Sequence, residues 1–455
     1  MLPAQGASSG HLAAQAVGAG CAEEEFEMNI PRTGRAAGAT AAADDGGWPG
    51  IVVRVGQRPG EADVCGTDNR ALQAAVDYVA RAGGGAVLIG PGTCLMRDSL
   101  HLRSGVAIRG SRPATLLRKC DAAVSRLVLD GDYGEEQITV ADASGPMGFA
   151  PGVGVAVWDD RSGGFHTTVA TLLEGPLPPA VPEEALGYTF RVSGPMQSDY
   201  LVKRDATAAT VFPVISGYHV AGARVEHLAI DGNRERNVGL NGCRGGGIFL
   251  YRSHGTVIAD CVVRDYHGDG ISFQHSHDVR VERCEVSGCA QLGIHPGSGS
   301  QRPVVVDCHS HHNGTIGLYL CWRVRHGRFE RNRLEANGRT GISIGHKDTD
   351  NVFVENVVAG NGRYGVYFRD ESAPMAGHRN RFVRCTIAGN GPAVPAAPTD
   401  AWDGEGADVR VDGETRGVVF EQCQIGHASA IGGDGLPAGV VVGPRAEAPV
   451  FAGRT

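Results

Sequence analysis

The residues of this sequence that could do chemistry gather between positions 275 and 371. The densest stretch, Gly345-His346-Lys347-Asp348-Thr349-Asp350, brings together an imidazole, an ammonium group and two carboxylates. A second stretch, Arg369-Asp370-Glu371, follows soon after it. A His or Lys beside a carboxylate can move protons, so both stretches indicate acid–base chemistry.

Aromatic and basic side chains extend this set. Aromatic rings can stack on sugar rings, and guanidinium groups can bind carboxylates or hydroxyls, so the mixture predicts a site for a sugar polymer. A solvated strand face and salt-linked turns are the alternatives. We predict catalytic roles for His346, Lys347, Asp348, Asp370 and His295. We predict substrate-binding roles for Tyr319, Trp322, Arg323, Tyr367, Arg369, His275 and Glu371.

A glycine repeat indicates the elements that position these residues. Glycine recurs at spacings of 23 or 24 residues, at Gly247, Gly270, Gly293, Gly317, Gly341 and Gly365. A short β-favouring run with apolar first and third places follows each glycine, as in Gly-Ile248-Phe-Leu-Tyr. This pattern predicts short strands with one buried face, repeated in every coil of a right-handed parallel β-helix.

A second column runs in step with the glycines and consists of Cys261, Cys284, Cys308, Asn332, Asn356, Cys385 and Cys423. Stacked Asn side chains can bond backbone groups of neighbouring coils, and a small Cys fits the same buried position. We therefore expect free thiols in this column.

Equivalent positions of neighbouring coils lie about 4.8 Å apart, so distant residues form columns on the surface. The predicted outward column is Phe249, Ser272, His295, Tyr319, Ser343 and Tyr367. On this basis we expect Asp370 to lie about 5 Å from His346 and to orient its ring. The Asp269-Gly270 segment is interpreted as a turn.

The sequence resembles the pectate-lyase-like β-helix superfamily. The resemblance lies in Gly66-Thr67-Asp68, in Gly83-Gly84-Gly85 through Thr93, and in the coils of residues 222–425. It implies an all-β solenoid whose N-terminal end is covered by a helix that Asp68 caps. The coil pattern is similar to that of polysaccharide lyases and mannuronan epimerases. Only Gly293, Ile294 and Pro296 match an epimerase motif, so no catalytic pair is carried over.

The site composition and the resemblance together predict an enzyme that cleaves a polysaccharide or oligosaccharide by β-elimination at a uronate. His346 or Lys347 would remove the proton α to the carboxylate. Arg323 or Arg369 would neutralise the carboxylate, and Tyr319 or His295 would protonate the leaving oxygen.

Two alternatives remain open. One is a glycoside hydrolase or glycosyl transferase with paired carboxylates from Asp348, Asp370 and Glu371. The other is a glycan-binding solenoid without activity. No cofactor is predicted, although Asp348, Asp350, Asp370 and Glu371 could supply the carboxylate cluster that calcium would need, an ion that pectate lyases use.

Four segments are expected along the chain. They are a flexible arm (1–47), a cap with the first coils (48–120), an inserted β-rich lobe (121–221), and the main β-helix with a C-terminal cap (222–455). The lobe could wall a substrate groove or contact another subunit, so an oligomer is possible.

Composition excludes two partner classes. The 455 residues contain 42 Lys and Arg against 50 Asp and Glu, so no basic excess favours nucleic acid. No apolar run is long enough to predict a membrane span. No secretory signal is recognised near the N-terminus, so the sequence alone predicts a cytoplasmic protein, or a secreted one if it starts at a mature N-terminus.

Overall fold

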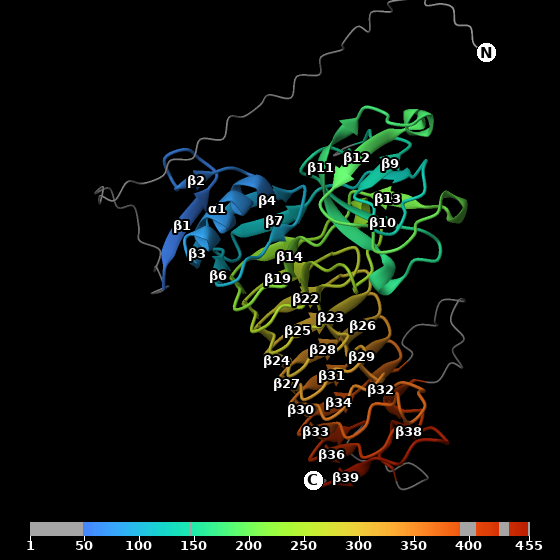
Figure 1. Ribbon diagram of the computed structural model, residues 1–455. Helices are drawn as coiled ribbons and strands as arrows, with labels where there is room; N and C mark the ends of the chain where they lie inside the picture. The colour runs from blue at the N-terminus through green and yellow to red at the C-terminus, as the bar shows by residue number, and fades with distance from the viewer. Residues whose placement is uncertain (1–48, 146–147, 392–405, 427–435, 454–455) are drawn as a thin grey trace, which may run out of the picture.

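The computed structural model describes residues 49–145, 148–391, 406–426 and 436–453 (Figure 1). The arm predicted for residues 1–47 lies outside this part of the chain. Three long parallel sheets form the body of the molecule, and each coil contributes one short strand to each sheet. This is the parallel β-helix that the glycine period predicts.

The first sheet has thirteen strands and the second and third have ten each. In spatial order, sheet 1 contains β2 (Val64–Cys65), β1 (Ile51–Gly56), β3 (Gly85–Ile89), β6 (Val106–Arg109), β15 (Arg224–Glu226), β18 (Val257–Ala259), β21 (Arg280–Glu282), β24 (Val304–Val306), β27 (Arg328–Glu330), β30 (Val352–Val354), β33 (Arg381–Val383), β36 (Val419–Glu421) and β39 (Val450–Ala452). Sheet 2 contains β5 (Leu100–His101), β14 (Ile215–Tyr218), β17 (Ile248–Tyr251), β20 (Ile271–Gln274), β23 (Leu292–Gly297), β26 (Ile316–Tyr319), β29 (Thr340–Ile344), β32 (Tyr364–Phe368), β35 (Ala407–Val411) and β38 (Val440–Val442). Sheet 3 contains β4 (Gly92–Met96), β7 (Thr115–Lys119), β16 (Ala229–Asp231), β19 (Val262–Arg264), β22 (Glu285–Ser287), β25 (His309–His311), β28 (Arg333–Glu335), β31 (Val357–Ala359), β34 (Thr386–Ala388) and β37 (Gln424–Ile425).

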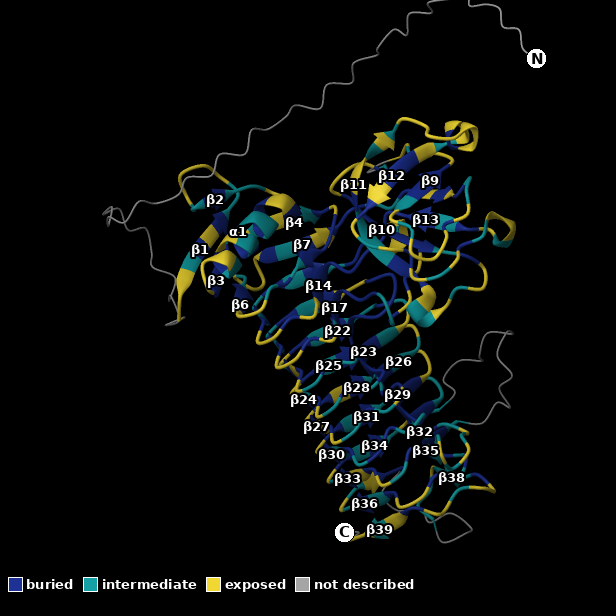
Figure 2. Ribbon diagram, in the orientation of Figure 1, coloured by how far each residue is buried: buried dark blue, intermediate teal, exposed yellow. Residues whose placement is uncertain are grey.

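The core runs along the axis of the coils (Figure 2). The apolar residue after each repeat glycine faces inward, and these positions pair strand to strand, as Ile248 with Ile271 and Ile271 with Ile294. Phe329, Phe353, Phe382 and Phe420 stack in successive coils with ring centroids 4.4 to 4.8 Å apart. Identical side chains therefore repeat at the strand spacing, which fixes the register of the coils.

The Asn and Cys column is confirmed. The Asn332 side chain accepts the Cys308 N–H at 3.0 Å, and the Asn356 side chain accepts the Asn332 N–H at 2.9 Å. All eleven cysteines of the described residues are free thiols, as expected. A parallel Asn column at Asn313, Asn337, Asn361 and Asn390 bonds in the same way at the next corner.

A helix covers the N-terminal end of the coils, as predicted. Helix α1 spans Asn69–Arg81, and the Asp68 carboxylate accepts the Arg70 N–H at 2.9 Å as its cap. Leu72, Ala75 and Val79 are buried against the first coils. The helix thus closes the apolar end of the solenoid.

An antiparallel sheet forms a separate lobe beside the first coils (Figure 1). Its spatial order is β8 (Val124–Arg126), β13 (Thr207–Ala209), β10 (Gly154–Trp158), β11 (Thr168–Leu177), β12 (Tyr188–Val192) and β9 (Gln137–Val140). Four short 3-10 turns complete the structure: η1 (Gly164–His166), η2 (Pro182–Leu186), η3 (Val202–Arg204) and η4 (Arg234–Arg236). The lobe has its own apolar core, which includes Phe190 and Tyr200. Within the described residues, no helix has the length and apolar character needed to cross a membrane.

Candidate active site

The outer face of sheet 2 carries the predicted column. Register pairs join Ser272 to His295, Tyr319 to Ser343, and Ser343 to Tyr367. At the N-terminal end, Ser216 pairs with Phe249 and with His101, so the column begins two coils earlier than the sequence indicated. Positions far apart in the sequence therefore lie side by side on the outer face of sheet 2, which forms one wall of the candidate site.

The upper part of this wall is covered. Phe249 and Ser272 are fully buried, and the Gly242 carbonyl accepts the Ser272 hydroxyl at 2.6 Å. Arg244 donates to the Phe165 carbonyl of η1 at 2.9 Å, which ties this covering segment to the lobe. The open part of the wall therefore begins near β26.

His275 belongs to the covered part. Its ring lies 5.6 Å from the rings of Phe165 and Tyr251, within an aromatic cluster beneath η1. Burial and neighbouring arginines hold the pKa of His275 below its usual value. The structure thus places His275 against the lobe and not beside Tyr319.

His295 is buried beside Asp269. Only 3% of the residue is exposed, and its Nδ1 lies 2.7 Å from Asp269 Oδ2. Burial lowers the pKa of His295, but the Asp269 carboxylate and the Cys321 thiol more than offset this and raise it to about 9. The direct acid role predicted for His295 is therefore not supported, because the covering segment excludes it from the surface.

Asp269 is a partner that sequence reasoning missed. Its interpretation as a turn residue omits its buried contact with His295. The signal that could have found it is the coil period, because Asp269 precedes His295 by about one repeat and reaches toward the next strand.

Tyr319 lies between this buried pair and a guanidinium. Its ring centroid is 5.2 Å from that of His295 and 4.7 Å from the Arg369 guanidinium carbon. Burial raises the pKa of Tyr319, against the lowering effect of Arg369, so the phenol keeps its proton at neutral pH. The half-buried Tyr319 therefore presents a phenol O–H and not a phenolate.

Arg369 is held by protein acceptors. It donates to Ser343 Oγ and to the Leu320 carbonyl at 2.9 Å each, and it lies 3.1 Å from Asp348 Oδ2. These contacts leave Arg369 less free for a substrate carboxylate than the sequence suggested. Its charge instead acts on Tyr319 and on His346, whose Nδ1 is 3.4 Å from Arg369 Nη2.

Asp348 lies beneath the turn and not on its surface, so its predicted catalytic role is not supported. It is fully buried and accepts the Val324 N–H at 2.9 Å and the Gly345 N–H at 3.1 Å. Burial raises its pKa to about 7, whereas Arg369 and the two N–H groups lower it. Asp348 therefore supports the turn, as the Asn columns do elsewhere.

The predicted contact between Asp370 and His346 is wrong. His346 Nε2 lies 2.6 Å from Glu371 Oε1, while Asp370 is exposed and pairs with Arg445. Successive side chains of an extended segment point to opposite sides, so Glu371 faces the imidazole when Asp370 faces away. The imidazole is oriented by a carboxylate as expected, but by the neighbouring one.

Two neighbouring turns have an unusual backbone. Trp322 and Arg323 have φ angles of 65° and 68°, and His346 and Lys347 have φ angles of 47° and 69°. Among the described non-glycine residues, only these two pairs place two consecutive residues in the left-handed region. Such a conformation costs free energy with a β-carbon present, and this strain is typical of functional sites.

These turns place an aromatic ring, an imidazole and a guanidinium together. The Trp322 and His346 rings lie 5.1 Å apart, and Trp322 is 43% exposed. The Arg323 guanidinium carbon lies 5.9 Å from the indole centroid. Neither Arg323 nor Lys347 forms an ion pair with any residue in the described ranges.

His346 is neutral at neutral pH. Burial and the Arg369 charge lower its pKa, and Glu371 partly opposes them. Glu371 can only accept, so it fixes the proton on Nε2, and the Nδ1 lone pair faces Arg369 Nη2 at the long distance of 3.4 Å. Tyr367 is half-buried against Tyr364, with ring centroids 4.8 Å apart, and stands one coil further along the same wall.

The carboxylates that could have supplied a calcium cluster do not lie together. Asp348 binds Arg369, Asp350 binds Arg379 at 2.7 Å, Asp370 binds Arg445, and Glu371 binds His346. In the part of the chain that the structure describes, no three His, Cys, Asp or Glu side chains could hold a metal ion together.

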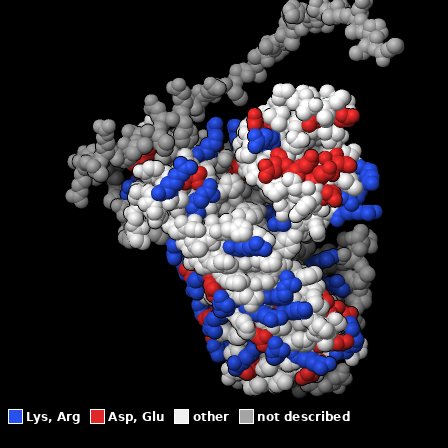
Figure 3. Space-filling model, viewed as in Figure 1, with Lys and Arg blue, Asp and Glu red and all other residues white. Residues whose placement is uncertain are grey.

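Charge is distributed unevenly over the molecule. Figure 3 shows a patch of Asp and Glu side chains on the lobe, whereas Lys and Arg side chains are interspersed with Asp and Glu on the coils below it.

Comparison with known proteins supports the fold. Residues 246–425 match the family model described as the right handed beta helix region. No curated protein sequence matches the chain. The fold of the chain is therefore a right-handed parallel β-helix, as the sequence resemblance indicated.

Solved structures of this fold differ widely in name. A structure described as a glycoside hydrolase has a TM-score of 0.53 at 10% identity, over 89% of this chain and 96% of that one. ORF18 of Geobacillus virus E2 has a TM-score of 0.48 at 11% identity, over 84% of this chain and 56% of the viral one. The AlgE4 A-module, an Azotobacter vinelandii mannuronan C-5 epimerase, has a TM-score of 0.45 at 14% identity, over 85% of this chain and 91% of that one. The chain thus spans just over half the length of the viral protein.

Proposed function

We propose that the protein is a carbohydrate-active enzyme that cleaves a uronate-containing polysaccharide by β-elimination. The observation that carries this proposal is the pair of left-handed turns at residues 322–323 and 346–347. They bring together an exposed indole, a neutral imidazole and a guanidinium that forms no ion pair within the described part of the chain. The glycoside hydrolase among the structures of this fold agrees with the substrate class.

Each group has one role in the proposed reaction. Trp322 stacks on a sugar ring, and Arg323, with Lys347 beside it, binds the uronate carboxylate. His346 is the base, because its neutral Nδ1 can take a proton, whereas Glu371 positions the ring. Tyr319 is the acid, because its phenol keeps its proton beside Arg369.

In the proposed step, His346 Nδ1 removes the proton α to the carboxylate. The released electron pair forms the carbon–carbon double bond and breaks the glycosidic carbon–oxygen bond. The leaving oxygen takes a proton from Tyr319. Arg323 stabilises the charge that develops on the carboxylate during proton removal.

Hydrolysis by paired carboxylates has less support. Asp348 is buried, Asp370 is directed toward Arg445, and Glu371 is bonded to His346. No two of these carboxylates face each other across an open space in which a glycosidic bond could lie.

The test is incubation with polygalacturonate and alginate while the ultraviolet absorbance of an unsaturated uronate is followed. We expect the absorbance to rise with time for the wild type. The rate of this rise should be lower by about 10²-fold or more for His346→Gln. His309→Gln is the matched control, since His309 forms a similar pair with Glu335, at 3.0 Å, on sheet 3. New reducing ends without absorbance would indicate hydrolysis, and binding alone would indicate a glycan-binding protein.

A further inference from the structure

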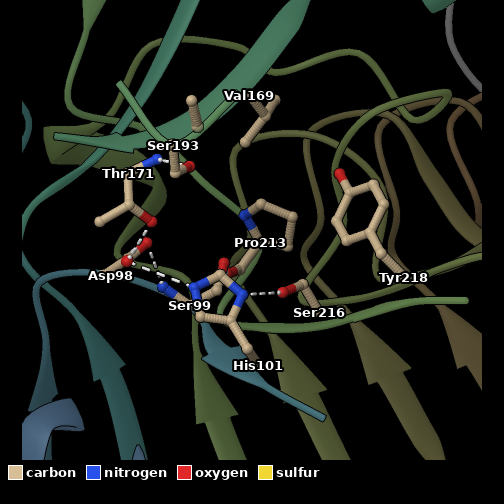
Figure 4. A pocket seen from close by; sticks show the side chains of 10 residues that line it. Asp98, Ser99, His101, Val169, Thr171, Ser193, Pro213, Ser216 and Tyr218 are labelled. Carbon is tan, nitrogen blue, oxygen red and sulfur yellow. Dashed lines mark hydrogen bonds and ion pairs between the residues drawn. The ribbon is translucent and has the colours of Figure 1, made fainter. Parts of the chain in front are cut away.

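A pocket lies between the first coils and the lobe, away from the site described above. It has a volume of about 240 Å³. Asp98, Ser99, His101, Pro213, Ser216 and Tyr218 of the coils line it on one side, and β11 residues with Ser193 line it on the other (Figure 4). The lobe therefore completes a pocket that the solenoid alone would leave open.

A hydroxyl, an imidazole and a carboxylate are bonded in series in this pocket. Ser216 is only 1% exposed, but it lines the pocket, and its Oγ lies 2.9 Å from His101 Nδ1. His101 Nε2 lies 3.3 Å from Asp98 Oδ2. Figure 4 shows the His101 ring between the other two side chains. The imidazole thus joins the hydroxyl and the carboxylate through its two nitrogens, which is the arrangement of a nucleophilic triad.

The carboxylate is held firmly in place. Asp98 is buried and accepts the Thr171 hydroxyl at 2.6 Å and the Ser99 N–H at 2.7 Å. Since a carboxylate can only accept, it fixes the proton of a neutral His101 on Nε2. Nδ1 then accepts the Ser216 hydroxyl proton, so the seryl oxygen is activated as a nucleophile.

The fold explains this placement. His101 on β5 pairs directly with Ser216 on β14, so both side chains stand side by side on the outer face of sheet 2. Asp98 lies just before β5, and Thr171 comes from β11 of the lobe. Ser193 accepts the Thr171 N–H, and its own hydroxyl proton has no acceptor within the described ranges. That hydroxyl and the Tyr218 phenol are the donors that a carbonyl oxygen in the pocket would meet.

We propose that this pocket is a second active site, an esterase that removes short acyl groups. Ser216 Oγ bonds to the acyl carbon as its proton moves to His101 Nδ1, and the alcohol leaves with that proton. Water then attacks the acyl-enzyme and gives a proton to His101. Acid is released, and the Ser216 hydroxyl regains the proton. Ester and water thus become acid and alcohol, with no other reactant.

The chemical class of the ligand follows from the pocket. Its size suits a small acyl group such as acetyl, and its polar lining suits an ester of a sugar hydroxyl. The sugar part of this inference rests on the proposed function, because His101 and Ser216 lie at the start of the surface column of sheet 2 that also contains Tyr319. The ester chemistry does not rest on it.

The first experiment uses p-nitrophenyl acetate, which contains no sugar, and a fluorophosphonate reagent followed by peptide mass spectrometry. We expect hydrolysis of the ester and labelling of Ser216. Ser216→Ala and His101→Gln should each lower hydrolysis by about 10²-fold or more. Ser104→Ala is the control, since Ser104 lies outside the pocket and accepts only the Ala221 N–H.

Asp98→Asn tests the positioning role. It should lower kcat and leave KM within about two-fold, because an amide can donate to Nε2 and favour the wrong tautomer. A loss of folding instead would appear in the circular dichroism spectrum. Wild-type protein that neither hydrolyses the ester nor reacts at Ser216 would overturn the proposal, as would labelling of another serine.

An acetylated polyuronate separates this proposal from the proposed elimination. Ser216→Ala should abolish acetate release and leave the absorbance of unsaturated product unchanged. His346→Gln should abolish the absorbance of unsaturated product and leave acetate release unchanged. Loss of both signals in one variant that stays folded would contradict two separate sites.

Discussion

Replacement of Asp269 by Asn tests the buried pair of Asp269 and His295, whose ring contacts that of Tyr319. The pKa of His295 is about 9 in the folded protein, above its ordinary value of 6.5. A group with a raised folded-state pKa stabilises the fold fully below its unfolded pKa, and this stabilisation is lost as the pH rises through the folded value. The His295 contribution is therefore complete below pH 6.5 and vanishes above pH 9.

The magnitude follows from the size of the shift. A shift from 6.5 to about 9 corresponds to about 3 kcal/mol at pH 6, about 1 kcal/mol at pH 8 and almost nothing at pH 10. Asp269→Asn removes the carboxylate but keeps the shape, so it should cost about these amounts. Because the pair is buried, salt should change the result little.

The assay is urea unfolding of the wild type and Asp269→Asn at pH 6, 8 and 9. The difference in free energy of unfolding should decrease as the pH rises. Asp307→Asn is the control, since its pair with Arg331 is 40–45% exposed and should contribute at most about 1 kcal/mol at any of these pH values. A difference for Asp269→Asn that is constant or grows with pH would refute the reasoning.

Three further predictions concern the coil and the proposed site. Asn337→Ala should lower the free energy of unfolding by about 3 kcal/mol or more, because Asn337 bonds both Asn313 and Asn361 at 3.0 Å and its loss leaves buried groups unpaired. Urea unfolding measures this change, and a decrease below about 1 kcal/mol would contradict the prediction. Glu371→Gln should move the acid limb of the pH–rate profile to lower pH. Glu371 raises the pKa of His346, and the base must be neutral, so without this carboxylate His346 would stay neutral at lower pH. An acid limb that moves to higher pH would argue against His346 as the base. Trp322→Ala should raise KM by roughly five-fold with little change in kcat, which corresponds to a stacking contribution of about 1 kcal/mol. An unchanged KM would show that the indole does not bind the substrate.

The fold could be predicted because its signals are periodic. The glycines, the inward apolar positions and the Asn and Cys column each repeat at the coil spacing, and each corresponds to a contact between neighbouring coils. The capping role of Asp68 was also visible, because an N-cap depends only on local sequence.

The site could be predicted only in part. The periodic pattern places a residue in a column but does not show what covers it, so the burial of His295 and the bond from Ser272 to the Gly242 carbonyl were not visible. The choice between Asp370 and Glu371 as the partner of His346 depends on the directions of two adjacent side chains just after β32, which the coil period does not predict. The pair of His101 and Ser216 was missed because a hundred-residue lobe separates these two neighbouring strands in the sequence.

The structure of the protein with a bound uronate oligosaccharide tests the proposed function most directly. The proposal predicts a sugar ring on Trp322, its carboxylate within about 3 Å of the Arg323 guanidinium, and the carbon α to that carboxylate beside His346 Nδ1. An oligosaccharide bound on another sheet, or on this wall with His346 remote from the α-carbon, would contradict it.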